Sequence, residues 1–117
     1  MINKISFISY PVSNLQQSII FYRDLLGLKF LLKKDAWAEF TVYGQRFAIP
    51  EENFNPEVNK QTGATVYFEA KPIKKMVHDL KLKGVFFKGE IEEHEYGKLI
   101  LFSDPDNNSL GLYEPFG

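Results

Sequence analysis

Hydrophobic and polar residues alternate over short stretches along most of this 117-residue chain. Such alternation is typical of β-strands with one buried face. In residues 4–12, Ile8, Tyr10 and Val12 share one face, while Phe7 and Ser9 share the other. The same pattern, bounded by turn residues, predicts further strands over residues 28–34, 36–43, 45–50, 64–70, 85–87, 98–103 and 109–113.

Two segments have helical spacing instead. The first begins after Ser13 and Asn14, whose side chains are suited to an N-cap, and ends at Gly27. The second begins at Pro72 and ends at Gly84. Its expected buried stripe consists of Ile73, Met76, Val77 and Leu80.

The two halves of the chain resemble each other. Gly27 and Gly84 both stand between a predicted helix and a predicted strand, and each half reads strand–helix–strand–strand–strand. This repetition predicts an α+β fold of two βαβββ modules within a single domain, residues 1–117. Module one covers about 1–50, a polar linker about 51–62, and module two about 63–117; two unrelated α+β halves are the alternative.

The amino-acid composition and net charge limit the partners and the chemistry that we expect of this chain. The net charge is −1 with acids and bases mixed, which favours neither nucleic acid nor an anionic membrane as a partner. There are no cysteines, so disulfides, thiolate metal sites and a cysteine nucleophile are excluded. No apolar run has the length of a signal or membrane segment, and we expect a cytoplasmic protein. Aromatic residues make up 15% of the chain, and we expect some of them to line a pocket.

The last predicted strand follows a turn, Asp104-Pro105-Asp106-Asn107-Asn108, rich in residues that favour tight turns. Several segments of the chain resemble the vicinal oxygen chelate superfamily. They are this turn, the first-strand segment from Ile8 to Leu15, and the motifs Phe21-Tyr22 and Leu25-Leu26-Gly27. That superfamily includes glyoxalase I, bleomycin- and fosfomycin-resistance proteins and extradiol dioxygenases. The resemblance covers nearly the whole chain and implies an open, curved, barrel-like arrangement of eight strands with the helices outside. It also implies a homodimer.

In metal-dependent members of that superfamily, four His or Glu side chains from the strands bind a divalent ion. The resemblance places these positions at Phe7, Pro50, Thr65 and Gly111, with Ala64 as an alternative to Thr65. Only Thr65 has a side chain that could bind a metal, and it would be a poor ligand. We therefore expect no metal site and no cofactor. His78 is expected on an exposed helix face and His94 in a charged loop, outside any metal site.

Strand alternation predicts which side chains share a cavity with those four positions. We expect an aromatic, partly polar ligand-binding surface, with Arg46 as a further candidate member. Its predicted members are Phe7, Ser9, Trp37, Ala48, Thr65, Tyr67, Glu69, Gly111 and Tyr113. Trp37 and Glu39 share one face of the third strand, and the pattern leaves open which face that is. Glu39 and Glu69 are weak candidates for catalysis if burial raises their pKa.

The leading hypothesis is a metal-independent binding protein of the glyoxalase and bleomycin-resistance type, whose partner is an aromatic or partly apolar small molecule. The alternative is a glyoxalase- or dioxygenase-like enzyme, a lyase, isomerase or oxygenase, that uses other metal ligands or acid–base catalysis by a Glu. A third hypothesis is a ligand-free dimerisation module, in which Phe7, Trp37 and Tyr113 would plug the cavity. Residues 89–96 are interpreted as an acidic loop or a ragged sheet edge, and whether Glu90–Glu95 acts as a lid is left open.

Overall fold

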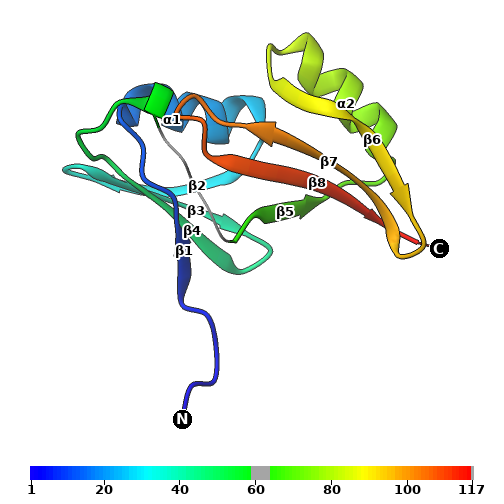
Figure 1. Cartoon of the computed structure of the whole chain (residues 1–117). Helices are drawn as coiled ribbons and strands as arrows, with labels where there is room; N and C mark the ends of the chain where they lie inside the picture. Colours follow the sequence, from blue (N-terminus) through cyan, green and yellow to red (C-terminus); the bar gives the residue numbers. More distant parts are fainter. Residues whose placement is uncertain (59–63, 117) are drawn as a thin grey trace. The chain divides into compact units, whose positions relative to one another are not determined.

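The computed structural model describes residues 1–58 and 64–116, which form two compact units, Met1–Glu57 and Val58–Gly117 (Figure 1). In the predicted linker, Pro56–Val58 forms a short 3₁₀ turn, and residues 59–62 lie outside the described part. Each unit contains one four-stranded sheet and one helical segment. The predicted α+β fold of two βαβββ modules is confirmed, and the two sheets are not closed.

The first unit has the strand order β1-β4-β3-β2, with β1 parallel to β4 and the other pairs antiparallel. Its helix α1 continues directly into a π-helical turn. The elements are β1 (Phe7–Ser9), α1 (Leu15–Ile19), the π-helical turn (Ile20–Leu25), β2 (Lys29–Lys34), β3 (Trp37–Val42) and β4 (Gln45–Pro50).

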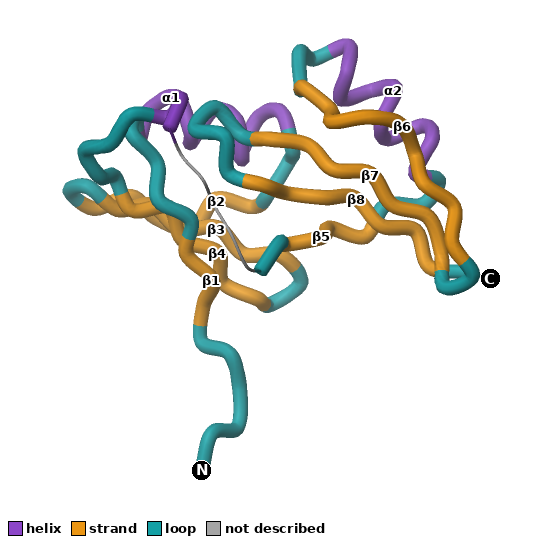
Figure 2. The backbone as a smooth tube through the Cα atoms, in the orientation of Figure 1, coloured by secondary structure: helices purple, strands orange, loops and turns teal. Residues whose placement is uncertain are grey.

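The second unit repeats this topology with the order β5-β8-β7-β6, in which β5 is parallel to β8 (Figure 2). Its elements are β5 (Val66–Glu69), α2 (Ile73–Leu82), β6 (Phe86–His94), β7 (Gly97–Ser103) and β8 (Ser109–Pro115). Gly27 and Gly84 both follow a helical segment with positive φ, 77° and 92°, as the repetition predicts. Neither helix of the described residues has the length and hydrophobicity needed to cross a bilayer.

In each unit the helix packs on one face of its sheet. Tyr22 is fully buried between the rings of Phe40 and Phe47, at centroid distances of 5.8 and 5.2 Å. In the second unit, the buried stripe of α2 consists of Ile73, Val77 and Leu80. Met76 was predicted to belong to this stripe, but its side chain is 40% exposed. The opposite face of each sheet has no helix of its own unit, and we call it the open face.

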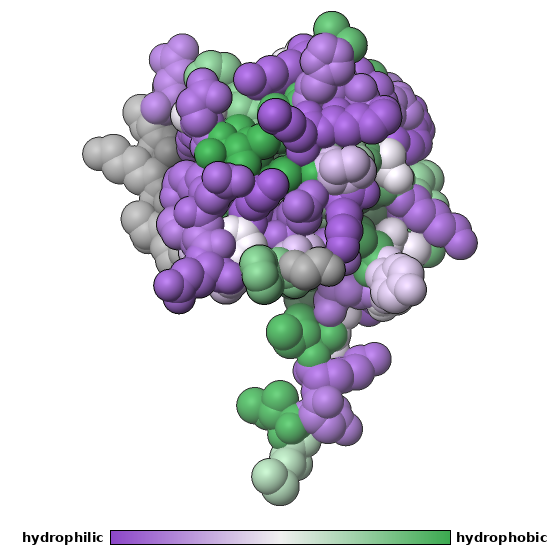
Figure 3. All heavy atoms as spheres, turned by 90° about the vertical axis from the view of Figure 1, so that its right-hand side faces the viewer, coloured by the Kyte–Doolittle hydropathy of each residue, from purple (hydrophilic) through white to green (hydrophobic). Residues whose placement is uncertain are grey.

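The first strand and the first helix differ from the predicted elements. The first strand begins at Phe7 rather than at residue 4, because the preceding residues pair with no strand of the described chain. The apolar side chains of this exposed segment stand out from a largely hydrophilic surface (Figure 3). The first helix widens near its end, where the Leu26 N–H donates to the Phe21 carbonyl, five residues back.

The acidic stretch lies at the edge of the second sheet, the second of its two interpretations. Strand β6 extends to His94 and pairs with β7 on both sides of an irregularity between Lys88 and Glu92, and Glu95 lies in the turn between these strands. Because β6 is an edge strand, its charged side chains remain in water and discourage pairing with other chains.

The turn before β8 is organised by the Asp104 carboxylate, whose residue is only 4% exposed. It accepts hydrogen bonds from the backbone N–H groups of Asp106 and Asn108, at 2.9 and 2.8 Å, and from the Asn108 amide at 2.9 Å. Asn107 adopts a positive φ of 64°. The predicted strand–turn–strand is confirmed.

A carboxylate distant in sequence caps each helix. The Leu15 N–H at the start of α1 donates to Glu51 at 2.8 Å, and the Ile73 N–H at the start of α2 donates to Glu114 at 2.9 Å. Asn14 adds a local cap by accepting from the Gln17 N–H at 3.0 Å. In both units, the end of the last strand is thus tied to the first turn of the helix.

We expect Glu51→Ala to lower the free energy of unfolding by about 1 kcal/mol, the usual cost of removing a helix cap. Urea unfolding followed by circular dichroism measures the change. Glu52→Ala is the matched control, since Glu52 is the exposed neighbour, and it should change stability by less than about 0.5 kcal/mol. Equal effects of the two substitutions would contradict a capping role for Glu51.

Candidate functional site

The open face of the first sheet brings together most of the predicted site residues of that unit. Strand β1 pairs with β4 so that Phe7 lies beside Arg46 and Ser9 beside Ala48. Strand β3 pairs with β4 so that Glu39 lies beside Ala48. Pairing also places Trp37 beside Pro50 on the same face. The structure thus answers the question that the sequence left open, namely which face Trp37 and Glu39 share.

Two aromatic rings form a corner on this face. The rings of Phe7 and Trp37 meet edge to face, with centroids 5.7 Å apart and an interplanar angle of 80°. Phe7 remains 42% exposed. The corner therefore offers aromatic surface to a ligand, in an arrangement that aromatic pairs prefer.

A buried carboxylate holds this corner in place. Glu39, 5% exposed, accepts the Trp37 indole N–H at 2.7 Å. It also accepts two N–H groups of Arg46, Nε at 2.8 Å and Nη2 at 2.9 Å. The Arg46 guanidinium in turn lies over the Phe7 ring, 5.4 Å from its centroid. These four side chains form one connected group, which we call the Glu39 cluster.

The hydrogen bonds from Arg46, and secondarily from Trp37, lower the pKa of Glu39 below its ordinary value, although burial opposes this shift. The same contact raises the pKa of Arg46. Glu39 is therefore an ionised carboxylate at neutral pH, whose lone pairs are engaged by donors. The condition for Glu39 as a catalytic acid, a raised pKa, is not met.

The sequence indicated Arg46 only as a further candidate for the ligand-binding surface, and its contacts with Glu39 and Phe7 were not predicted. The signal was present in the hairpin: a turn at Tyr43-Gly44 between the strands sets Thr41 opposite Arg46. That register places Glu39 diagonal to Arg46 on the same face, within reach of a long side chain.

The open face of the second sheet carries the remaining predicted residues. Tyr67 lies beside Gly111, and Glu69 beside Tyr113, on the parallel strands β5 and β8. A Cβ atom at Gly111 would collide with the Tyr67 ring, so the ring packs directly against the glycine backbone. Tyr67 is 44% exposed, Glu69 is exposed, and Thr65 is half-buried just before β5.

The hydroxyl of Tyr113 is engaged within the unit. It donates to the Tyr96 carbonyl at 2.6 Å, at the β6–β7 turn. The Tyr96 ring stacks on His94 at 4.9 Å with an interplanar angle of 3°, and His94 lies 3.1 Å from a Glu92 oxygen. His94 therefore belongs to a hairpin strand, while His78 is exposed on α2 as predicted.

The residues at the four positions that the resemblance assigned to metal ligands do not fit a metal ion. Phe7 and Pro50 in the first unit and Gly111 in the second have no donor atom in their side chains. The Tyr67 ring occupies the space where a side chain at position 111 would begin. Within residues 1–58 and 64–116, the His, Asp and Glu side chains form no group of three that could hold a metal.

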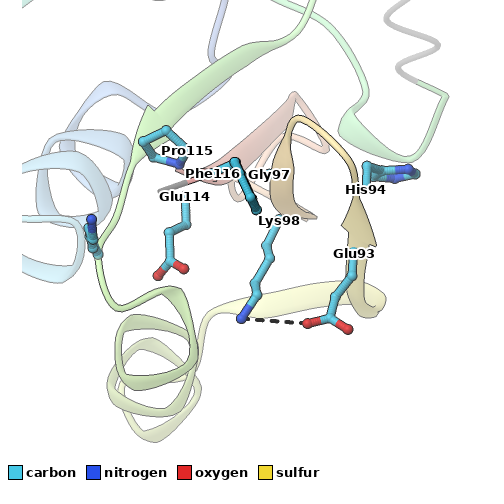
Figure 4. A pocket seen from close by; sticks show the side chains of 8 residues that line it. Glu93, His94, Gly97, Lys98, Glu114, Pro115 and Phe116 are labelled. Atoms are coloured by element: carbon cyan, nitrogen blue, oxygen red, sulfur yellow. Dashed lines mark ion pairs between the residues drawn. The ribbon is translucent and has the colours of Figure 1, made fainter.

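A pocket of about 360 Å³ lies in the second unit (Figure 4). Its wall includes the ends of β6, β7 and β8, with Lys98 and Glu93 paired at 3.5 Å. Glu114, which caps α2, and Phe116 also line it. The charges in this wall are mixed, and no predicted site residue contributes to it.

Comparison with known proteins is consistent with this architecture. The family model described as Glyoxalase/Bleomycin resistance protein/Dioxygenase superfamily matches residues 4–112. Metallothiol transferase FosB of Staphylococcus saprophyticus is 30% identical over 117 residues, covering 97% of this chain and 78% of FosB.

Two solved structures have the same fold. The fosfomycin resistance protein FosX from Listeria monocytogenes, complexed with Mn(II) and sulfate, matches with a TM-score of 0.83 and 21% identity, covering 99% of this chain and 93% of that chain. TnmS3, an antibiotic binding protein from Streptomyces sp. CB03234, matches with a TM-score of 0.78 and 22% identity over 98% of both chains. At these identities the likeness concerns the fold alone.

The contact between Tyr67 and Gly111 can be tested by a double-mutant cycle. Gly111→Ala should lower the free energy of unfolding by about 1–3 kcal/mol, because the added methyl group forces the Tyr67 ring to move. In a Tyr67→Ala background the same substitution should cost much less. Equal costs in the two backgrounds, measured by urea unfolding, would show that the ring does not occupy this space.

The Glu39–Arg46 ion pair predicts a specific pH dependence. Since the folded state lowers the pKa of Glu39, its ionised form stabilises the folded chain above the ordinary Glu pKa of about 4.3. This stabilisation is lost as the pH falls through the lowered folded pKa. We expect Glu39→Gln to be less stable than the parent near neutral pH, and the difference to shrink toward about pH 3. A difference that grows on acidification would contradict the ion pair.

Proposed function

The chain belongs to the Glyoxalase/Bleomycin resistance protein/Dioxygenase superfamily, and within it we propose that the protein is a metal-independent binder of small molecules. Its ligand is an aromatic or partly apolar compound that binds on the open faces of the sheets, with the Glu39 cluster as the main contact surface. Sequestration of a toxic compound is the physiological role that this proposal implies. A homodimer in the cytoplasm is the expected setting.

The proposal rests mainly on the exposure and packing of the Phe7 side chain. At a position where metal-dependent relatives are expected to have a His, this chain has an aromatic ring that is 42% exposed and packs against Trp37. One substitution thus removes a metal ligand and adds a surface on which a planar ligand can stack. The Tyr67 ring against Gly111 is a second aromatic surface at a former ligand position.

Known relatives support binding as a function of this fold. FosB is named a metallothiol transferase, whereas TnmS3 is described as an antibiotic binding protein. The fold therefore accommodates both catalysis and binding, and the side chains at the site decide between them. Here the side chains favour binding, since Glu39 is held as an ion pair and the four ligand positions do not suit a metal.

A ligand-free dimerisation module is less well supported. That hypothesis requires Phe7, Trp37 and Tyr113 to plug the open faces, yet Phe7 keeps 42% of its surface exposed, while Trp37 and Tyr113 are half-buried. Tyr67, on the second open face, is 44% exposed. Exposed aromatic surface of this kind is more typical of a binding site than of a filled interior.

The proposal is tested by titrating the untagged protein with metals and with aromatic compounds while its thermal stability is measured. We expect no stoichiometric metal by elemental analysis and no stabilisation by Mn²⁺, Ni²⁺, Zn²⁺, Co²⁺ or Fe²⁺. An aromatic ligand at a hundred times its Kd should stabilise the folded state by about 2.7 kcal/mol. Because Trp37 is the sole tryptophan, its fluorescence should change with the same Kd.

Two variants locate the ligand. Phe7→Ala should weaken binding, because it removes one ring of the aromatic corner. Phe116→Ala should leave the affinity unchanged, since this equally aromatic and 82% exposed residue lines the separate pocket in the second unit. A loss of affinity in Phe116→Ala alone would move the ligand to that pocket. One tightly held metal ion per chain would overturn metal independence.

A further inference from the structure

Only one edge of the Arg46 guanidinium is hydrogen-bonded to Glu39. Its Nε and Nη2 atoms donate to the two oxygens of Glu39 at 2.8 and 2.9 Å. The cation lies 5.4 Å from the centroid of the Phe7 ring, which supports it from the face. Although Glu39 is almost fully buried, the Arg46 side chain is 47% exposed. The charge that faces solvent is therefore the cation.

Arg46 retains donors for a ligand. A guanidinium has five N–H groups, and the contacts with Glu39 use one on Nε and one on Nη2. Within residues 1–58 and 64–116, Nη1 has no hydrogen-bond partner. The free edge formed by Nη1 and Nη2 is a planar fork whose spacing matches the two oxygens of a carboxylate. Its orientation is already set by Glu39, so little conformational freedom would be lost on binding.

The surrounding charges favour an anion. The register of β2 and β3 places Lys29 beside Thr41 and Lys34 beside Trp37, on the same open face as Arg46. Both lysines are exposed. Among the residues that this register places on the open face of the first sheet, Glu39 is the sole carboxylate, and Arg46 already neutralises it. The face as a whole is thus positively charged beside an aromatic corner.

We propose that the ligand is an aromatic carboxylate, which stacks on the corner of Phe7 and Trp37 and places its carboxylate on the free edge of Arg46. This inference rests on the proposed binding function and makes Arg46 the residue that determines specificity. A neutral ring of the same shape gains the stacking contact but leaves the three remaining donors of Arg46 without a ligand partner.

The test compares two probes that share a ring system and differ in charge, 1-naphthoate and 1-naphthamide. Binding is followed through the indole N–H resonance of Trp37 in a ¹⁵N-labelled protein. This resonance is unique, because the chain has one tryptophan, and its proton is bonded to Glu39 within the site. We expect 1-naphthoate to bind about tenfold more tightly than 1-naphthamide, the gain typical of a charge-assisted hydrogen bond.

Arg46→Gln should weaken 1-naphthoate about tenfold and change 1-naphthamide by less than about twofold. Arg46→Lys keeps the charge without the planar fork and should give an intermediate loss. The matched control is Arg23→Gln. Arg23 also pairs with a neighbouring carboxylate, Asp24 at 2.8 Å, and lies 6.0 Å from a Phe ring, but it is in the π-helical turn. The substitution Arg23→Gln should leave the affinities for 1-naphthoate and 1-naphthamide unchanged.

The outcomes separate this inference from the proposed function. If both probes bind equally well and Arg46→Gln does not discriminate between them, the carboxylate preference is overturned while the aromatic binding site stands. If Arg46→Gln and Arg46→Lys weaken both probes to the same extent, Arg46 only supports the Phe7 ring, and the inference is likewise overturned. If neither probe perturbs the Trp37 resonance, both the inference and the proposed aromatic site are overturned.

Discussion

A single helix can cover only one face of a four-stranded sheet, and each unit of this protein has one helix per sheet. Tyr22 and the rings it contacts fill the helix-covered side of the first unit, and the stripe of α2 does so in the second. The opposite face of each sheet lacks this cover, and the residues there retain exposed aromatic surface. Because apolar area exposed to water is unfavourable, exposed aromatic surface of this kind is typical of a surface that another molecule covers.

The open faces of the two units differ in what supports their exposed aromatic rings. In the first unit, Phe7 is supported by Trp37 from the edge and by Arg46 from the face. An ion pair with one partner in contact with water contributes little to stability on its own, since the solvent screens the attraction between the charges. Glu39 is better understood as a group that orients Trp37 and Arg46 together. In the second unit, Tyr67 packs on bare backbone at Gly111 and no charged group is involved.

Much of this architecture could be predicted from the sequence. The strand and helix periods, the glycines at Gly27 and Gly84 and the turn after Asp104 gave the two βαβββ modules. The acidic stretch in β6 could not be assigned to a loop or to a sheet edge, because charged residues on an edge strand lack the alternating apolar pattern of a half-buried strand. The Glu39 cluster could not be predicted in full, since alternation shows which face a side chain shares but not which partners its long chain reaches.

The contact between Tyr67 and Gly111 limits which side chains position 111 can hold. The space beside the Gly111 backbone is occupied by an aromatic ring, so it is not a void. The Tyr67 ring fills it, so a side chain at position 111 requires the ring to leave. A carboxylate there would meet an aromatic face rather than a free site. The residues at positions 67 and 111 are thus coupled, and placing a carboxylate at position 111 would require a change at Tyr67 as well.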